Sequence, residues 1–287
     1  MKRLSITLYR RFRRSLSERS GSSFLSRVDQ VRLKEIISEN RRAVSLVNDW
    51  LPAGLIENSV FRYGVTPEVQ PLLNLPLDNE CCQADLLAYY GRTFDRRLKY
   101  LELGVSVGKT LWQILNTCAP CECWAFDIEE INPVLKEHFA LDAREEWPSR
   151  PESIKKTPSS ISRFTHQPTG SRLTYICADI FDERGWKLLA GGGFNLILSD
   201  ALHTPQALDF EWTQMTRSNI FDPQGAVIMW DDLDGAMRDW FRAKRPAIAG
   251  RLRVNLDRVN TLFLNGWLGG REYPHWTGLA LGKPLHS

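Results

Sequence analysis

The 287-residue sequence lacks an apolar run long enough to cross a membrane. Its longest apolar stretches, such as Phe194–Leu198, have the length of a strand, whereas a membrane-spanning helix needs about 20 apolar residues. The amino terminus also lacks the long apolar segment of a secretory signal. These absences exclude a transmembrane helix and indicate a cytoplasmic protein, although the basic amino terminus leaves organellar targeting open.

The sequence has little net charge, +3, but this charge is spread unevenly. Residues 1–20 hold seven basic residues against Glu18 alone, so the rest of the chain carries a small net negative charge. A mildly acidic body is not expected to bind nucleic acid over a whole domain. We predict that residues 1–25 form a flexible, solvated basic arm, with contact to a membrane surface or to nucleic acid as the alternative.

Cysteine is scarce and lacks the spacing of a disulfide framework. The six cysteines include the adjacent pair Cys81 and Cys82 and the cluster Cys118, Cys121 and Cys123. No second CxxC or CxxxH pair accompanies the cluster, as a zinc site would require. We therefore expect reduced, partly buried thiols, and metal binding by the cluster is the open alternative.

The first hundred residues differ in pattern from the rest of the chain. Apolar residues recur at helical spacing from Ser26 to Trp50, and Cys81 to Arg97 is again helical in character. Between them, residues 51–80 are rich in Pro, Asn and Leu, which indicates a surface loop. We therefore predict a helical amino-terminal extension over residues 26–97, followed by one domain over residues 98–287.

From Lys99 onward, short apolar runs alternate with helical stretches, which indicates βαβ units and an α/β fold with a mostly parallel sheet. The five runs are Tyr100–Leu103, Cys123–Phe126, Leu173–Cys177, Phe194–Leu198 and Ala226–Trp230. Closing strands, the last of them antiparallel, are predicted at Leu252–Leu256, Thr261–Leu264 and Thr277–Leu281. Residues 141–171 are dense in Ser, Pro and charge, and we predict that they form an inserted, mobile loop.

A glycine turn follows the first predicted strand, in the segment Glu102-Leu-Gly104-Val-Ser106-Val-Gly108-Lys-Thr110. Gly104 lets a ligand approach the backbone, and the helix that starts near Gly108 offers free N–H groups. A P-loop needs four residues between its glycines and the dinucleotide fingerprint is GxGxxG, so the GxxxG spacing fits neither. Glu102 would repel a pyrophosphate and favours a ligand with a positive centre and no phosphate.

Acidic residues stand at the ends of the next predicted strands. Asp127 lies 19 residues after Gly108, where a carboxylate can accept hydrogen bonds from ribose hydroxyls. Asp179 follows the third strand and is expected at the adenine end of such a ligand. Each acid alone is more often a helix cap or a loop residue, but three in register at carboxyl ends of strands indicate a binding site.

The glycine turn and the segment Ala-Phe-Asp127-Ile128 resemble the first two motifs of class I S-adenosylmethionine-dependent methyltransferases, and the resemblance covers about residues 98–235. The ExGxxxG spacing is similar to that of the cation-dependent O-methyltransferases of the catechol and caffeoyl-CoA type. The resemblance implies a Rossmann-like, doubly wound sheet and S-adenosylmethionine as cofactor. The cofactor contacts that it implies are Glu102, Gly104, Ser106, Gly108, Thr110, Asp127, Ile128, Asp179, Ile180 and Asp200.

Two further strand ends extend the resemblance. The family places one metal carboxylate at the position of Asp200 and an Asp-Asn pair at the position of Asp231 and Asp232, which implies Mg²⁺ or another divalent cation. Asp232 stands where Asn is usual, and this pair can also be one ligand and one helix cap. Where catechol-type enzymes carry a lysine base, this chain has His203, which with Asp200 is the predicted catalytic pair. A loop histidine is the alternative.

These observations predict methyl transfer from S-adenosylmethionine to a hydroxyl group of a small-molecule acceptor, assisted by a divalent cation. One alternative is a metal-free methyltransferase that acts on oxygen or nitrogen, and another is a non-catalytic adenosyl-ligand-binding or nucleic-acid-associated protein. Nucleic acid is not the expected partner, and a homo-oligomer stays open. Arg271 and His275 are interpreted as solvated residues of a turn near the site.

Overall fold

The computed structural model describes residues 28–51, 63–266, 268–269 and 274–282. The predicted basic arm, residues 1–25, lies outside the described residues. No helix in the described part is long and apolar enough to span a membrane.

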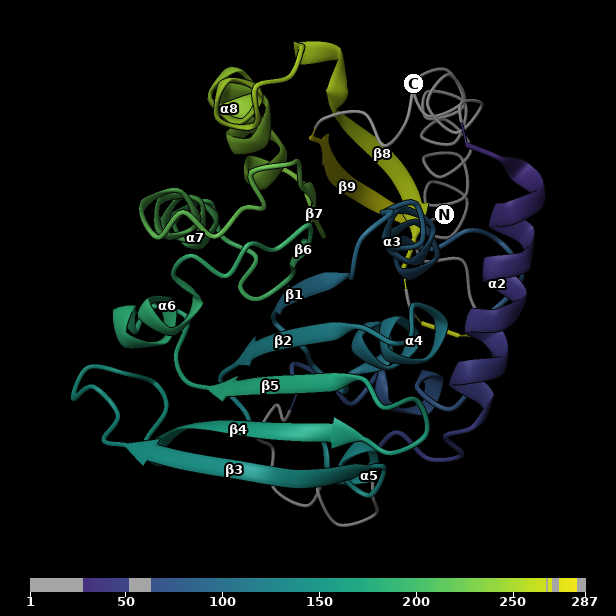
Figure 1. Cartoon of the computed structure of the whole chain (residues 1–287), viewed down its shortest axis with the longest axis vertical. Helices are drawn as coiled ribbons and strands as arrows, with labels where there is room; N and C mark the ends of the chain where they lie inside the picture. The colour runs from purple at the N-terminus through teal and green to yellow at the C-terminus, as the bar shows by residue number, and fades with distance from the viewer. Residues whose placement is uncertain (1–27, 52–62, 267, 270–273, 283–287) are drawn as a thin grey trace, which may run out of the picture.

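A nine-stranded sheet forms the centre of the described structure, in the order β3-β4-β5-β2-β1-β6-β7-β9-β8 (Figure 1). The five central strands are parallel: β5 (Arg172–Cys177), β2 (Glu122–Asp127), β1 (Lys99–Leu103), β6 (Leu196–Ser199) and β7 (Val227–Trp230). Antiparallel strands close both sides: β3 (Phe139–Trp147) and β4 (Ser159–His166) on one, β9 (Pro274–Leu281) and β8 (Val259–Asn265) on the other. The predicted Rossmann-like, mostly parallel sheet with an antiparallel closing strand is confirmed.

Helices cover both faces of this sheet, as Figure 1 shows. One face carries α2 (Gln30–Ser45), α3 (Gln83–Gly91) and α4 (Lys109–Thr117), and the other carries α6 (Glu183–Leu189), α7 (Pro205–Arg217) and α8 (Ala236–Leu252). Two shorter helices of three residues, η1 (Gln70–Leu72) and η2 (Leu256–Arg258), and the four-residue α5 (Pro133–Lys136) lie in connections. Each face buries its own apolar cluster against the sheet.

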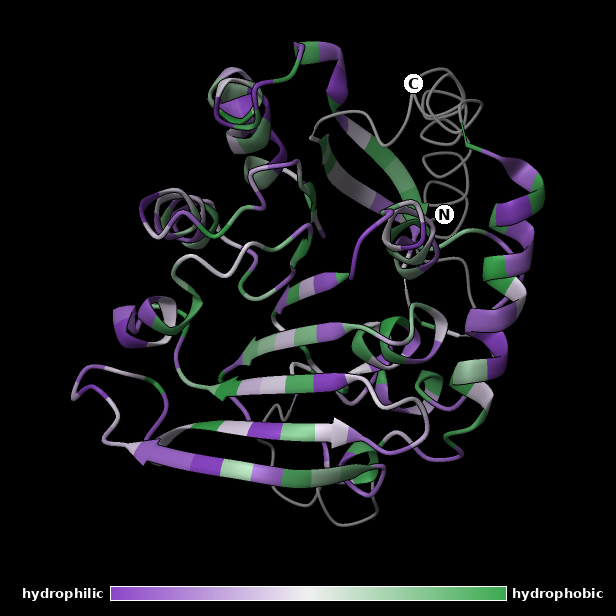
Figure 2. Ribbon diagram, viewed as in Figure 1, coloured by the Kyte–Doolittle hydropathy of each residue, from purple (hydrophilic) through white to green (hydrophobic). Residues whose placement is uncertain are grey.

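The amino-terminal helix α2 shares its core with the sheet domain. Its buried face includes Ile36, and this residue belongs to the same apolar cluster as Leu86 of α3 and Leu111 of α4. Its outward face is hydrophilic (Figure 2). Asp29 begins the helix by accepting hydrogen bonds from the backbone N–H groups of Val31 and Arg32.

Two predictions about chain segments are wrong. Residues 141–171 are not an inserted loop, because β3 and β4 form an antiparallel pair that extends the sheet from β5. The predicted strand Leu252–Leu256 does not form, because α8 continues to Leu252 and Arg253 ends it in the left-handed conformation. In β4 the buried apolar residues Ile161 and Phe164 are separated by polar ones, so the segment lacks a continuous apolar run.

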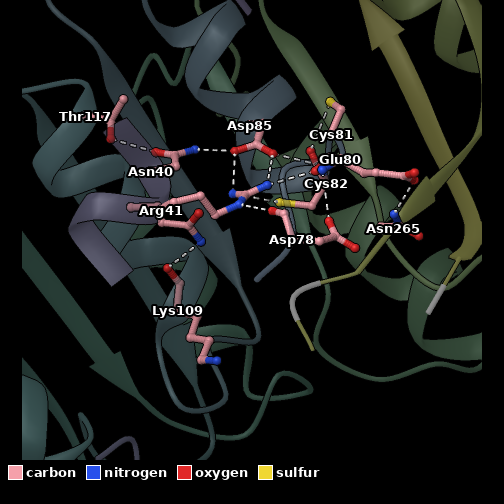
Figure 3. A network of polar contacts seen from close by, with 11 residues as sticks. Asn40, Arg41, Asp78, Glu80, Cys81, Cys82, Asp85, Lys109, Thr117 and Asn265 are labelled. Carbon is pink, nitrogen blue, oxygen red and sulfur yellow. Dashed lines mark hydrogen bonds and ion pairs between the residues drawn. The ribbon is translucent and has the colours of Figure 1, made fainter. Parts of the chain in front are cut away.

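A buried polar network joins α2 to α3 and α4 (Figure 3). The guanidinium of Arg41 donates to both carboxylate oxygens of Asp85, at 3.0 and 2.8 Å. Asp85 is fully buried and also accepts from the Asn40 amide at 2.8 Å, and the hydroxyl of Thr117 donates to that amide's oxygen at 2.6 Å. Since each buried polar group is paired, the network fixes how the amino-terminal helix packs on the domain.

We predict that Asp85→Ala lowers the free energy of unfolding by about 3–5 kcal/mol, because it leaves the Arg41 charge without its carboxylate partner and the Asn40 amide without its acceptor. The measurement is urea unfolding followed by circular dichroism. The control is Glu146→Ala, which removes an exposed partner of Arg144 and should cost less than about 1 kcal/mol. Equal losses for the two variants would contradict the role of the network.

Candidate active site

The carboxyl ends of β5, β2, β1, β6 and β7 meet at one edge of the sheet, since these strands are parallel neighbours. The turn after β1 lies there and has three residues with positive φ: Gly104 at 80°, Ser106 at 51° and Gly108 at 89°. A Cβ atom on Gly104 would lie 2.2 Å from the carbonyl oxygen of Asp200. Gly104 is therefore needed for the turn to pass the end of β6, whereas the sequence suggested that it makes room for a ligand.

Asp127, at the end of β2, holds this turn in place. One carboxylate oxygen accepts from the backbone N–H groups of Val105 at 2.6 Å and Ser106 at 3.1 Å, and the other accepts from Glu129 at 2.8 Å. The amides that a phosphate would use are thus bound to a carboxylate of the protein, which argues against a phosphate at this turn. A carboxylate has about four lone-pair sites, so Asp127 keeps room for one further donor, such as a ribose hydroxyl.

Glu102 lies in β1, just before the glycine turn. Its side chain is buried and accepts a hydrogen bond from the Tyr100 hydroxyl at 2.8 Å. Burial raises the pKa of Glu102 well above its usual value, although Tyr100 opposes the shift. Glu102 therefore supports the end of β1 from within the protein.

The end of the site where adenine is predicted to bind is partly covered by another segment of the protein. Asp179, after β5, accepts from the Ser153 hydroxyl at 2.8 Å and from the backbone N–H of Phe181 at 3.0 Å, so the β3–β4 connection lies over it. Beside it, Ile180 is half-buried and Ile128, after β2, is exposed. An exposed isoleucine at the ligand edge is a flat apolar surface on which a planar base can lie.

The start of α4 does not act as a phosphate site. Thr110 is buried in its first turn. The ammonium group of Lys109 is directed away from the turn, to the carbonyl oxygen of Leu73 and the Trp50 ring (centroid at 5.3 Å). Burial lowers the pKa of Lys109 to about 8. Lys109 and Thr110, which nearly match a P-loop, therefore have a structural role and do not form a phosphate site.

His203 and Asp200, the predicted catalytic residues, form a hydrogen-bonded pair after β6. Nε2 of His203 lies 3.0 Å from Oδ1 of Asp200, and Nδ1 lies 3.3 Å from Oδ2 of Asp232. Burial alone would lower the pKa of His203, but Asp200 and Asp232 outweigh it and raise this pKa to about 9. Burial and the charge of Asp231 raise the pKa of Asp200 to about 7. Because the two groups contact each other, they titrate as a unit.

A second pair, His275 and Asp231, was missed at the sequence level. Nε2 of His275 lies 2.5 Å from Oδ1 of Asp231, and the Thr277 hydroxyl donates to the same oxygen at 3.2 Å. Both side chains of the pair are about 95% buried, so His275 is not a solvated turn residue. Burial would raise the pKa of Asp231, but His275 outweighs it and the pKa lies below its usual value. Arg271 lies outside the described residues.

The pairing of β9 with β7 places His275 beside Asp231, and it is the information that could have identified this residue. Trp230 is opposite Gly278 in this antiparallel pair, so residues just before Gly278 lie beside the carboxyl end of β7. His275 and Thr277 are two residues apart and point to the same face of the strand. The sequence alone did not show that β9 begins at Pro274.

The expected metal triad of Asp200, Asp231 and Asp232 does not match the arrangement of these residues. Among the described residues, the group able to meet one ion is Asp231, Asp232 and His275, with one ligand atom from each within 4.8 Å of the others. Asp200 is paired with His203 instead. Mg²⁺ takes oxygen ligands and keeps several waters, whereas histidines already lie against all three carboxylates.

The cysteine cluster contains two thiols in contact. Sγ of Cys121 lies 3.5 Å from Sγ of Cys123, and both residues are buried. Within the described residues, no group of potential metal ligands includes a cysteine.

No protein-family model and no curated protein matches this chain. Among solved structures, it is similar to the cofactor-bound Rv0187 from MTB, at 14% identity over 89% of this chain and 91% of the other, with a TM-score of 0.45. The O-methyltransferase from Bacillus cereus in complex with SAH matches at 14% identity over 91% and 96%, with a TM-score of 0.42. The SAM-dependent methyltransferase from Agrobacterium tumefaciens matches at 17% identity over 70% and 61%, with a TM-score of 0.37. At these values the likeness identifies no reaction, substrate or metal for this chain.

Proposed function

We propose that this protein is an S-adenosylmethionine-dependent methyltransferase that acts on a hydroxyl group of a small molecule. The observation that carries the proposal is the convergence, at one edge of the sheet, of the glycine turn held by Asp127 and the pair of His203 and Asp200. The glycine turn suits a nucleoside-type ligand without a phosphate. His203 and Asp200 are an acid–base pair.

The residues of this edge fit S-adenosylmethionine. Asp127 has room for a ribose hydroxyl, and Ile128 is an exposed apolar surface for adenine. The edge carries the negative charge of Asp127 and Asp200, which suits a ligand with a sulfonium centre. Bound there, S-adenosylmethionine would supply an activated methyl group.

The protein's own part in the reaction is to position the acceptor and to move one proton. An acceptor hydroxyl near Nε2 of His203 or the carboxylate of Asp200 would lose its proton to the pair. Since Asp200, Asp232 and Asp231 raise the pKa of His203 to about 9, this side chain must lose its proton before it can act as a base. Asp232, against Nδ1 of His203, orients the ring. No step of this proposal requires Mg²⁺, and it is therefore closer to the metal-free form of the reaction.

We predict that Ile128→Asp weakens binding of S-adenosylhomocysteine at least about tenfold, which corresponds to about 1.4 kcal/mol, because it replaces an apolar surface by a charge. Isothermal titration calorimetry measures this effect. The control is Leu141→Asp, another exposed apolar residue, which lies on β3 and should leave binding unchanged. Binding of NAD in place of S-adenosylhomocysteine would overturn the cofactor assignment.

We predict that His203→Ala lowers the rate of methyl transfer about 10²–10⁴-fold, the usual contribution of a general base, while binding of S-adenosylhomocysteine changes little. The measurement is transfer of labelled methyl groups to a panel of hydroxyl acceptors. His138→Ala, which removes a histidine packed on Trp112, should retain full activity. If His203→Ala is as active as the unmodified chain, the pair is structural.

A further inference from the structure

We infer that Cys121 and Cys123 form a peroxide-sensitive thiol pair, which hydrogen peroxide converts into a reversible disulfide within the chain. The pair lies where β2 begins beside β5, at the opposite edge of the sheet from the candidate active site (Figure 1). The inference does not depend on the proposed methyl transfer.

The two sulfur atoms of the pair are in contact. Sγ of Cys121 lies 3.5 Å from Sγ of Cys123, and both thiols are free. A disulfide needs about 2.05 Å, so rotation of the side chains has to bring the sulfurs about 1.5 Å closer. Residues two apart in an extended segment point to the same face, which keeps the sulfurs side by side. A disulfide across so short a segment is strained, and strained disulfides are readily reduced again.

A chain of hydrogen bonds leads from a buried histidine to Cys121. Nδ1 of His166 lies 2.7 Å from Oγ1 of Thr169, whose hydroxyl donates to Oγ of Ser171 at 2.9 Å. A hydroxyl has one proton, so Nδ1 of His166 is the donor to Thr169. Oγ of Ser171 also accepts from the backbone N–H of Cys121 at 3.2 Å. The proton of Ser171 can therefore be donated to Sγ of Cys121, 3.5 Å away.

These donors favour the thiolate form of Cys121. The hydrogen bond from Cys123 lowers the pKa of Cys121 below its usual value, and Ser171 and Arg97 act in the same direction, whereas burial opposes them. Burial raises the pKa of Cys123 well above its usual value, and donation to Cys121 raises it further. The two thiols therefore have different roles. Cys121 is the nucleophile, and Cys123 keeps its proton until the second step.

Burial decides which oxidant can reach the pair. Both side chains are fully buried, but Ala119 and Pro120, just before Cys121, are exposed. Cys121 thus lies directly beneath a surface turn, and local opening of this turn admits a molecule little larger than water. A bulky oxidant such as glutathione disulfide needs a much larger opening, so hydrogen peroxide is the oxidant that fits.

The reaction has two steps. The sulfur of Cys121 attacks one oxygen of hydrogen peroxide, so that an S–O bond forms, the O–O bond breaks, and the departing hydroxide takes the thiol proton and leaves as water. The sulfur of Cys123 then attacks the sulfenic acid, so that the S–S bond forms, the S–O bond breaks, and the hydroxyl group leaves with the second thiol proton as water. The pair is oxidised by two electrons, and one peroxide is reduced to two waters.

The test treats the full, reduced chain with hydrogen peroxide and follows each thiol by alkylation and mass spectrometry. We expect the chain to lose two hydrogen atoms, dithiothreitol to reverse the change, and fragmentation to place the bond between Cys121 and Cys123. Fragmentation is needed because no Lys or Arg separates Cys118 from Cys123, so trypsin leaves these cysteines in one peptide. Glutathione disulfide at the same concentration should leave the pair reduced.

Cys177 is the matched buried thiol of the same chain. Burial raises the pKa of Cys177 to about 12, so we expect Cys121 to react with peroxide at least about tenfold faster. Ser171→Ala should slow the reaction of Cys121 by up to about tenfold, the effect of one pKa unit, because the thiolate loses a donor.

Two further variants separate the roles of the neighbouring cysteines. In Cys123→Ser the reaction should stop at the sulfenic acid of Cys121, which dimedone traps. Cys118→Ser should form the disulfide as fast as the unmodified chain, because the Cys118 thiol is directed to the carbonyl oxygen of Ala88. Both comparisons remain available if Ser171→Ala does not fold.

Several results would overturn the inference. They are a disulfide that includes Cys118, oxidation of Cys121 to a sulfinic acid while Cys123 stays reduced, and equal reaction of Cys121 and Cys177 with peroxide. Oxidation of the pair by glutathione disulfide as fast as by peroxide would contradict the role of burial. An unchanged rate in folded Ser171→Ala would contradict the role of the hydrogen-bond chain.

Discussion

The hydrogen bonds from the turn after β1 to the carboxylate of Asp127 organise the ligand edge of this protein. They tie the ends of two neighbouring strands together and hold the turn in a conformation with three left-handed residues. Asp127 is half-buried, and its removal from water raises its pKa, while the backbone N–H groups stabilise its charged form. The position of the turn, and of α4 behind it, follows from this one contact. The same contact removes the amides from any phosphate.

The central parallel strands could be predicted from the sequence because both of their faces are buried. Residues such as Ala125, Ile197 and Ile228 fall in continuous apolar runs, which need no knowledge of the neighbouring strands. The hairpin of β3 and β4 has no such run. β3 is exposed along most of its length, and β4 places Ser and Arg between its buried residues. An edge strand with this composition resembles a polar loop until its pairing partner is known.

The same limit applies to the candidate site. Residues that directly follow a parallel strand, such as Asp200 and Asp231, could be placed at one edge from the order of the strands alone. Whether two of them share an ion or a proton depends on residues from distant parts of the chain. His275 comes from the last strand and Gln83 from α3, and both meet beside Asp231. Their side-chain positions depend on the register of β9 against β7, which composition and spacing do not show.

The outermost strand β3 affects how the sheet can grow. Its exposed residues include Asp142, Arg144, Glu145 and Glu146, and its pairing with β4 shifts register between Leu141 and Ala143. An unpaired strand edge is a template for addition of another strand, and charged side chains and bulges counteract this. A second chain that aligned here would have to dehydrate these charges and meet a bent strand. The sheet is therefore protected from edge-to-edge association along β3, where the hairpin of β3 and β4 extends it.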